Sequence, residues 1–128
     1  KDYSLSKHMT LKLYSYNLCG SCRKAKKFLD SRGIKYQEIP IRIQPPTKGE
    51  LKQMAAKLHL KRLFNTSGQD YRLLNIKEKR ETLTIKEQIE LLHSNGNLIK
   101  RPFAIGTAHG KTIHITGFKE EEWKQLFP

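Results

Sequence analysis

Cysteine is scarce in this sequence, and long hydrophobic runs are missing from it. The chain of 128 residues contains only two cysteines, whereas a secreted disulfide scaffold carries more of them at wider spacing. No stretch approaches the roughly 18 consecutive apolar residues that a membrane span needs, and the first ten residues lack the apolar core of a signal peptide. We therefore expect a cytoplasmic protein that does not enter the membrane.

Acidic side chains are also few compared with basic ones. The 12 Asp and Glu residues face 25 Lys and Arg residues, which leaves a net charge of +13. The basic residues occur throughout the chain without a dominant block, and no zinc finger, aromatic RNA-binding motif or basic zipper is visible, so we expect no direct contact with nucleic acid. The charge belongs either to solvated faces of an ordinary basic protein or to a site for an anionic substrate.

The remaining composition suits one folded domain. Hydrophobic residues make up 37% and charged residues 29% of the chain, which is typical of a folded, soluble protein, and the length suits a single core. Because the domain-like sequence begins at Met9, we expect residues 1–8 to be a remnant of cloning. Residues 9–128 are then expected to form a single domain.

The first part of the chain predicts a strand, a helix and a second strand. Residues 11–16 alternate between apolar and polar side chains, as a strand does. Residues 23–31 favour a helix, and the side chains that share its sheet-facing side are Cys22, Ala25, Phe28 and Leu29. Residues 34–41 are rich in strand-forming side chains. A strand–helix–strand order implies a right-handed crossover, and hence a parallel pair of strands.

The middle of the chain, about 46–97, predicts a helical insertion. Thr47–Glu50 and Thr84–Glu87 each have the spacing of a capping box, which marks the start of a helix. Apolar side chains then recur at helical spacing. The expected buried faces consist of Leu51, Met54, Ala55 and Leu58 in the first of these helices and of Ile85, Ile89 and Leu92 in the second.

The end of the chain predicts a hairpin and a last helix. Residues 103–105 and 112–115 indicate two strands that turn at Gly110. A helix with Trp123, Leu126 and Phe127 on its apolar side follows. The whole order, β-α-β, then helices, then β-β-α, predicts an α/β fold of the thioredoxin-like (glutaredoxin-like) type, with a mixed sheet and a helical insertion.

The two cysteines form a Cys19-Gly20-Ser21-Cys22 motif between the first strand and its helix. Unpaired N–H groups and partial positive charge at a helix N-terminus stabilise a thiolate, and lower its pKa below the ~8.5 of a free cysteine. We therefore expect Cys19 to be a nucleophile, and Cys22, one turn later, to resolve a disulfide or adduct formed on Cys19. Gly20 and Ser21 suit a tight entry into the helix.

Two other interpretations of the cysteines remain. They could simply fill space in the core. They could also bind zinc, but a structural zinc site needs about four ligands. His109 and His114, near the end of the chain, are the histidines that could supply further zinc ligands. Their spacing is not that of a zinc site. We therefore expect neither a metal nor a bound cofactor.

Four segments of the chain form a recognisable set. In chain order they are YNLCGSCRKA at residues 16–25, LFNTSGQDYR at 63–72, NGNLIKRP at 95–102, and Gly117-Phe118 followed by Trp123. Together they resemble the arsenate reductase (ArsC)/Spx family, which is thioredoxin-like and carries its active-site loop at the position of the two cysteines. The similarity covers about residues 9–127, essentially the whole expected domain.

The resemblance implies roles for single residues. It implies that Cys19 is the catalytic cysteine and that Arg72 and Arg101 match arginines that hold an oxyanion. A guanidinium group is suited to this because it donates two hydrogen bonds at once and keeps its charge. Arg23 follows the second cysteine as an arginine does in the family loop, where it could support the thiolate. Pro102 matches a proline that such folds hold in the cis form beside the cysteine.

One difference from the single-cysteine arsenate reductases bears on function. Those enzymes have a serine where this chain has Cys22, and they depend on glutathione and glutaredoxin. The resemblance therefore leaves three possibilities: a self-resolving reductase of a small oxyanion or a thiol/disulfide substrate, an Spx-like redox switch that binds RNA polymerase, and a family member without arsenate activity. The first needs an external thiol donor, either thioredoxin or glutaredoxin with glutathione.

Overall fold

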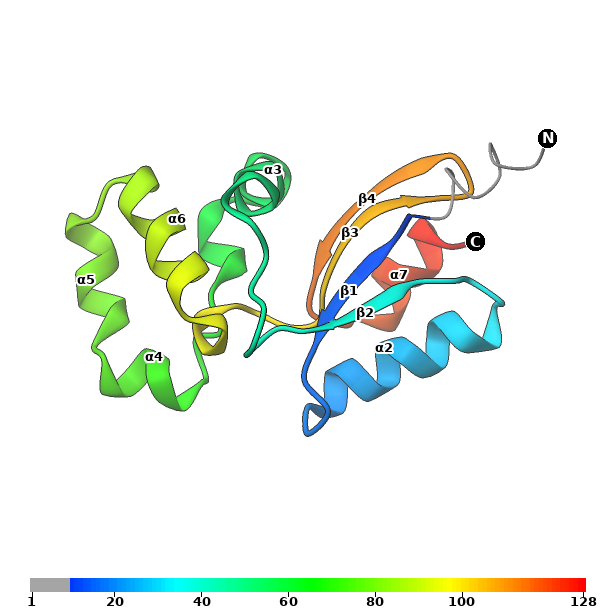
Figure 1. The fold of residues 1–128 in the computed structure, drawn as a ribbon, viewed down its shortest axis with the longest axis horizontal. Helices are drawn as coiled ribbons and strands as arrows, with labels where there is room; N and C mark the ends of the chain where they lie inside the picture. Colours follow the sequence, from blue (N-terminus) through cyan, green and yellow to red (C-terminus); the bar gives the residue numbers. More distant parts are fainter. Residues whose placement is uncertain (1–9) are drawn as a thin grey trace. The chain divides into compact units, whose positions relative to one another are not determined.

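The computed structural model describes residues 10–128, which form two compact units (Figure 1). The first unit contains residues 10–39 and Arg101–Pro128, and the second contains Pro40–Lys100. The second unit is therefore somewhat longer than the interval 46–97 expected for the insertion. The expectation that residues 1–8 are a cloning remnant lies outside the described residues.

A mixed four-stranded sheet organises the first unit, and its strand order is β2-β1-β3-β4. The strands are β1 (Lys12–Ser15), β2 (Gln37–Pro40), β3 (Phe103–Ala108) and β4 (Lys111–Thr116). Strand β3 pairs antiparallel with both β1 and β4, whereas β1 and β2 run in the same direction (Figure 1). This is the predicted thioredoxin-like arrangement, in which segments from the two ends of the chain meet in one sheet.

Strand β2 is shorter than predicted. The sequence suggested a strand over residues 34–41, whereas β2 spans Gln37–Pro40. Ile34 lies in the turn that ends the preceding helix: its N–H donates to the carbonyl oxygen of Leu29 at 3.0 Å. The chain then passes into the sheet, where the N–H of Gln37 donates to the carbonyl oxygen of Leu11 at 2.8 Å. Strand-forming side chains alone could not distinguish a core residue in a turn from a residue in the ladder.

Helices α2 (Gly20–Ser31) and α7 (Glu120–Leu126) cover one face of the sheet (Figure 1). Their apolar sides join the core, as the sequence predicted for Cys22, Ala25, Phe28 and Leu29 and for Trp123 and Phe127. Phe28 contacts Trp123 edge-on, with ring centroids 5.9 Å apart. The indole N–H of Trp123 donates to the carbonyl oxygen of Gly117 at 3.0 Å, so this buried polar group has a partner.

The second unit consists of short helices, labelled α3 to α6 in Figure 1, with two 3₁₀ turns. Both predicted capping boxes are present, at Thr47–Glu50 and at Thr84–Glu87. Leu51 and Met54 are buried as predicted, while Ala55 and Leu58 are half-buried. The elements are α3 (Lys48–Leu58), η1 (Leu60–Leu63), α4 (Gln69–Leu73), α5 (Ile76–Thr82), α6 (Ile85–Ser94) and η2 (Gly96–Leu98).

The predicted buried face of α6 was wrong at Ile85, whose side chain is 69% exposed. Ile89 and Leu92 are buried as expected, but Gln88 is buried with them. The amide of Gln88 donates to the carbonyl oxygen of Leu83 at 3.2 Å. A helical side chain covers the turn before its own Cα atom, and Ile85, as the first residue of α6, has no such turn beneath it.

Residues 95–97 contact two other segments of the second unit. Asp70 on α4 accepts hydrogen bonds from the amides of Asn95 and Asn97, at 3.1 and 3.2 Å. Gly96 lies directly against the carbonyl oxygen of Ile41, and a Cβ atom at this position would overlap that oxygen. Within residues 10–128, no helix combines the length and apolar character that crossing a bilayer requires.

A candidate thiol site at the start of helix α2

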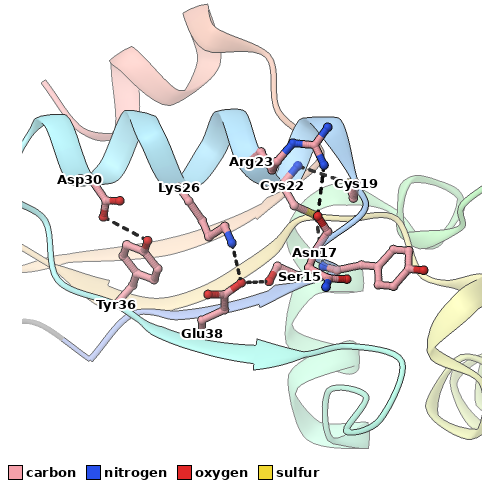
Figure 2. Close-up of polar contacts among 10 residues, drawn as sticks. Ser15, Asn17, Cys19, Cys22, Arg23, Lys26, Asp30, Tyr36 and Glu38 are labelled. Atoms are coloured by element: carbon pink, nitrogen blue, oxygen red, sulfur yellow. Dashed lines mark hydrogen bonds and ion pairs between the residues drawn. The ribbon is translucent and has the colours of Figure 1, made fainter.

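Cys19 lies between β1 and α2 and is the N-cap residue of that helix. Its backbone is extended (φ −96°, ψ 119°), and its carbonyl oxygen accepts the first helical hydrogen bond, from the N–H of Arg23 at 3.1 Å. Its Sγ accepts a hydrogen bond from the N–H of Cys22 at 3.2 Å (Figure 2). The sulfur thus takes the place of the oxygen that usually caps a helix, where it faces unpaired N–H groups.

The thiols of Cys19 and Cys22 are unpaired, and they differ in acidity. The hydrogen bond from the Cys22 side chain, followed by the Cys22 N–H and the charge of Arg101, lowers the pKa of Cys19 to about 5, although burial acts against it. The hydrogen bond to Cys19 and burial both raise the pKa of Cys22. At neutral pH the pair therefore consists of a thiolate at Cys19 and a thiol at Cys22.

The two sulfurs also differ in accessibility. Cys19 is half-buried at the mouth of the helix, whereas Cys22 is fully buried on the side of α2 that faces the sheet. The Sγ of Cys22 accepts a hydrogen bond from the N–H of Tyr16 at 3.5 Å. An external reagent therefore meets the more acidic sulfur first.

Arg101 joins this site from the segment that enters β3. Its guanidinium carbon lies 5.0 Å from the ring centroid of Tyr16, and its charge contributes to the lowered pKa of Cys19. Its Nη1 is buried without a hydrogen-bond partner in the described part of the chain. The Arg101–Pro102 peptide bond is cis, as the resemblance implied. The fold thus brings the predicted arginine to the thiolate.

The other predicted residues of the loop have mainly structural contacts. Arg23 donates from Nη1 to the carbonyl oxygen of Asn17 at 3.1 Å, which closes the loop before Cys19 (Figure 2). Gly20 and Ser21 form the exposed first turn of α2. Arg72 lies on the exposed side of α4 in the second unit.

Sequence reasoning missed a polar cluster at the base of the thiol loop. Ser15 donates to a carboxylate oxygen of Glu38 at 2.6 Å, and the ammonium group of Lys26 lies 3.0 Å from the same oxygen (Figure 2). Burial acts to raise the pKa of Glu38, but the Ser15 hydrogen bond and Lys26 outweigh it, so this pKa is lowered. The cluster joins β1, β2 and α2 one helical turn beyond Cys22.

No signal in the sequence pointed to that cluster, because its members come from three different elements. The inward position of Ser15 followed from the alternation in β1, but its partner did not. Within residues 10–128, His, Cys, Asp and Glu side chains do not gather in a group of three or more that could hold a metal ion. Among the described residues, the chemical groups that form the site are therefore two thiols and one guanidinium group.

Comparison with known proteins finds a matching family profile and several similar sequences. The sequence profile of the ArsC family matches residues 14–126. The Bacillus subtilis (strain 168) protein YusI, which is named as uncharacterized, is 49% identical over 119 residues, 91% of this chain and 98% of its own length. The regulatory protein MgsR of the same strain is 32% identical over 97 residues, 74% of this chain and 75% of its own length.

A solved structure has the same fold. It is described as a possible arsenate reductase from Streptococcus mutans UA159, and it is 37% identical in sequence with a TM-score of 0.77. The match covers 89% of this chain and 97% of the Streptococcus chain. The relatives thus include a protein named as a regulator and one described as a possible arsenate reductase.

Proposed function

The chain belongs to the ArsC family, and from that premise we propose that it is a thiol–disulfide oxidoreductase in which Cys19 is the nucleophile and Cys22 the resolving thiol. The observation that carries the proposal is the asymmetry of the two cysteines. Cys19 is accessible and has a pKa lowered to about 5, whereas Cys22 is buried and has a raised pKa. A thiolate is the form of cysteine that attacks an oxidant.

With arsenate as substrate, the first step is attack of the Cys19 thiolate on arsenic. A sulfur–arsenic bond forms, and one arsenate oxygen leaves as water after it takes up protons. Arg101 faces the developing charge with a fixed guanidinium group whose Nη1 has no partner among residues 10–128. The family resemblance implies that Arg72 also holds an oxyanion.

In the second step, Cys22 loses its proton and attacks the Sγ of Cys19. A sulfur–sulfur bond forms and the sulfur–arsenic bond breaks, with its electron pair going to arsenic, which leaves as arsenite. The two thiols are thereby oxidised to one disulfide while arsenic(V) is reduced to arsenic(III). A thiol donor, either the dithiol of thioredoxin or glutaredoxin with two glutathione molecules, then reduces the disulfide by exchange.

Arsenate-dependent oxidation of NADPH tests the proposal. The assay is run once with thioredoxin and its reductase, and once with glutathione, glutaredoxin and glutathione reductase. We expect turnover with at least one donor, and we expect Cys19→Ser to abolish it. The Arg72→Ala variant tests the second arginine, because it should raise the KM for arsenate if Arg72 contacts the anion.

Cys22→Ser is the matched control within the same loop. This variant keeps the nucleophile, so it should accumulate a mixed disulfide or an adduct on Cys19, or depend on added thiol for turnover. Turnover that survives unchanged in Cys19→Ser would rule out the mechanism. A complete lack of turnover with both donors, while both thiols remain titratable, would argue against arsenate as the substrate.

A redox-regulatory role is the second candidate, since the relative MgsR is named as a regulatory protein. In this case, formation of the Cys19–Cys22 disulfide would alter a surface that contacts RNA polymerase, as the Spx resemblance implies. Binding of purified RNA polymerase to the oxidised and the reduced protein tests this role. Equal binding of both forms, or none, would contradict it.

A further inference from the structure

An open pocket of about 600 Å³ lies within the second unit, among η1, α4 and α5. All of its lining residues belong to the Pro40–Lys100 unit. The volume lies within the range of about 300–1,000 Å³ that is typical of small-molecule sites. The lining residues are Lys61, Thr66, Tyr71, Lys77, Arg80 and Glu81.

The lining is strongly unbalanced in charge. Three cationic side chains face a single carboxylate, that of Glu81. In the described part of the chain, Lys61, Lys77 and Arg80 make no ion pair with any acidic side chain. Lys77 and Glu81 lie one turn apart on α5, where such a pair would form readily. The pocket therefore holds positive charge that the protein itself does not neutralise.

Arg80 is fixed in place while part of its hydrogen-bonding capacity stays unused. Its guanidinium carbon lies 4.7 Å from the ring centroid of Phe64, and its Nη1 donates to the hydroxyl of Tyr71 at 3.3 Å. Tyr71 itself is only 6% exposed, so this anchor is rigid. The Nε of Arg80 is buried and finds no partner within residues 10–128. This Nε is closed to solvent, so a ligand in the pocket meets the charge and the Nη groups of the guanidinium, of which Nη2 makes no hydrogen bond within residues 10–128.

We propose that this pocket binds the phosphate group of a small phosphorylated molecule. Lys61, Lys77 and Arg80 supply the charge that a phosphate dianion requires, and the guanidinium group offers it a paired donor. The hydroxyl groups of Thr66 and Tyr71 offer neutral hydrogen bonds at the same site. Because the pocket is larger than one phosphate ion, the remaining volume accommodates the organic part of the ligand.

The test follows backbone amide chemical shifts of the full chain during titration with inorganic phosphate, AMP and adenosine. Each titration is compared with sodium chloride at the same ionic strength. We expect saturable shifts at the amides of Thr66, Tyr71 and Glu81 with the two phosphates, and none with adenosine. Tighter binding of AMP identifies a phosphate ester as the ligand class, and equal binding identifies the phosphate ion alone.

Two lysines on α5 form a matched pair of variants. Lys77→Gln removes a pocket charge and should weaken phosphate binding about tenfold or more. Lys79→Gln removes the same charge from the same helix outside the pocket lining, and should change affinity by less than about twofold. Arg80→Lys keeps the charge but loses the fork of donors, and should also weaken binding.

Three results would overturn the proposal. One is the absence of saturable shifts in the pocket with both phosphates. Another is the same shifts with sodium chloride, which would mean ionic screening only. The last is equal weakening by the Lys77 and Lys79 variants. Phosphate that binds at the thiol site instead would shift the amides of Cys19 and Arg101, so the two sites are distinguished in the same spectra.

Discussion

The two units of the chain are organised by different kinds of contact. The first unit is a sheet in which β1 pairs with β3, so that its core and its thiol site are built from both ends of the sequence. The second unit is a series of short helices, two of which begin with a local capping box. We therefore expect a substitution in the first unit to affect residues far away in the sequence. A substitution in the second unit should affect mainly its neighbours in the sequence.

Trp123→Ala should have the largest effect, because it removes the centre of the long-range core. Trp123 is fully buried and contacts both Phe28 and Phe127. Removing a buried tryptophan costs about 3–5 kcal/mol, which is a large part of the stability of a small domain. Urea unfolding measures this loss. A loss below about 1 kcal/mol would mean that the first unit does not depend on this cluster.

Arg101→Ala should change both binding and acidity at a residue far away in the sequence. A charge-assisted contact is worth about 1.5–3 kcal/mol, so the affinity for an oxyanion should fall correspondingly. The positive charge of Arg101 also favours the Cys19 thiolate, and its removal should raise the pKa of Cys19 above about 5.

The pH dependence of Cys19 alkylation reads out that change. In the native protein the rate should rise through a midpoint near pH 5, since the thiolate forms as pH increases past its pKa. In Arg101→Ala the midpoint should move to higher pH. The same depressed pKa stabilises the fold above the ordinary thiol pKa, and this contribution is lost as pH falls towards 5. An unmoved midpoint would remove Arg101 from the site.

Thr84→Ala should have a smaller and more local effect. The Thr84 hydroxyl accepts from the N–H of Glu87 at 3.1 Å, and the loss of such a cap costs about 1 kcal/mol. Thr47→Ala makes the equivalent change at α3 and should cost a similar amount. Hydrogen exchange should show loss of protection in the helix that follows the mutated cap. Protection lost across the sheet instead would contradict the local character of this unit.

Ile85→Ala should have the smallest effect of the series. The side chain is 69% exposed, so its truncation should change stability by less than about 0.5 kcal/mol. Ile89→Ala is the matched control one turn later on the same helix, and it should cost about 2–5 kcal/mol because Ile89 is buried. Thermal unfolding of the two variants compares them directly.

The sequence predicted best what depends on neighbouring residues. Both capping boxes and the buried face of α2 followed from spacing alone, and the structure has them. The position of Cys19 at a helix N-terminus followed from the order of strand, loop and helix. Residue spacing could not predict that Arg101 lies beside the thiol. That expectation came from the family motif.

The sequence predicted least well what depends on tertiary packing. Strand β2 proved shorter than its strand-forming residues suggested, and Ile85 proved exposed at the start of its helix. The Ser15–Glu38–Lys26 cluster was missed because it joins three elements. The pocket around Arg80 was missed because Lys61 comes from a different element than Lys77 and Arg80, and the three carry no common motif.

The unequal burial of the two sulfurs gives the thiol pair a fixed order of events. A bulky disulfide or reagent reaches Cys19 and not Cys22, so a native molecule should accept one label and an unfolded molecule two. Under the proposed mechanism, any covalent intermediate with a partner is therefore expected at Cys19. Cys22 is then expected to react only after Cys19 is modified, and its attack releases the group bound to Cys19.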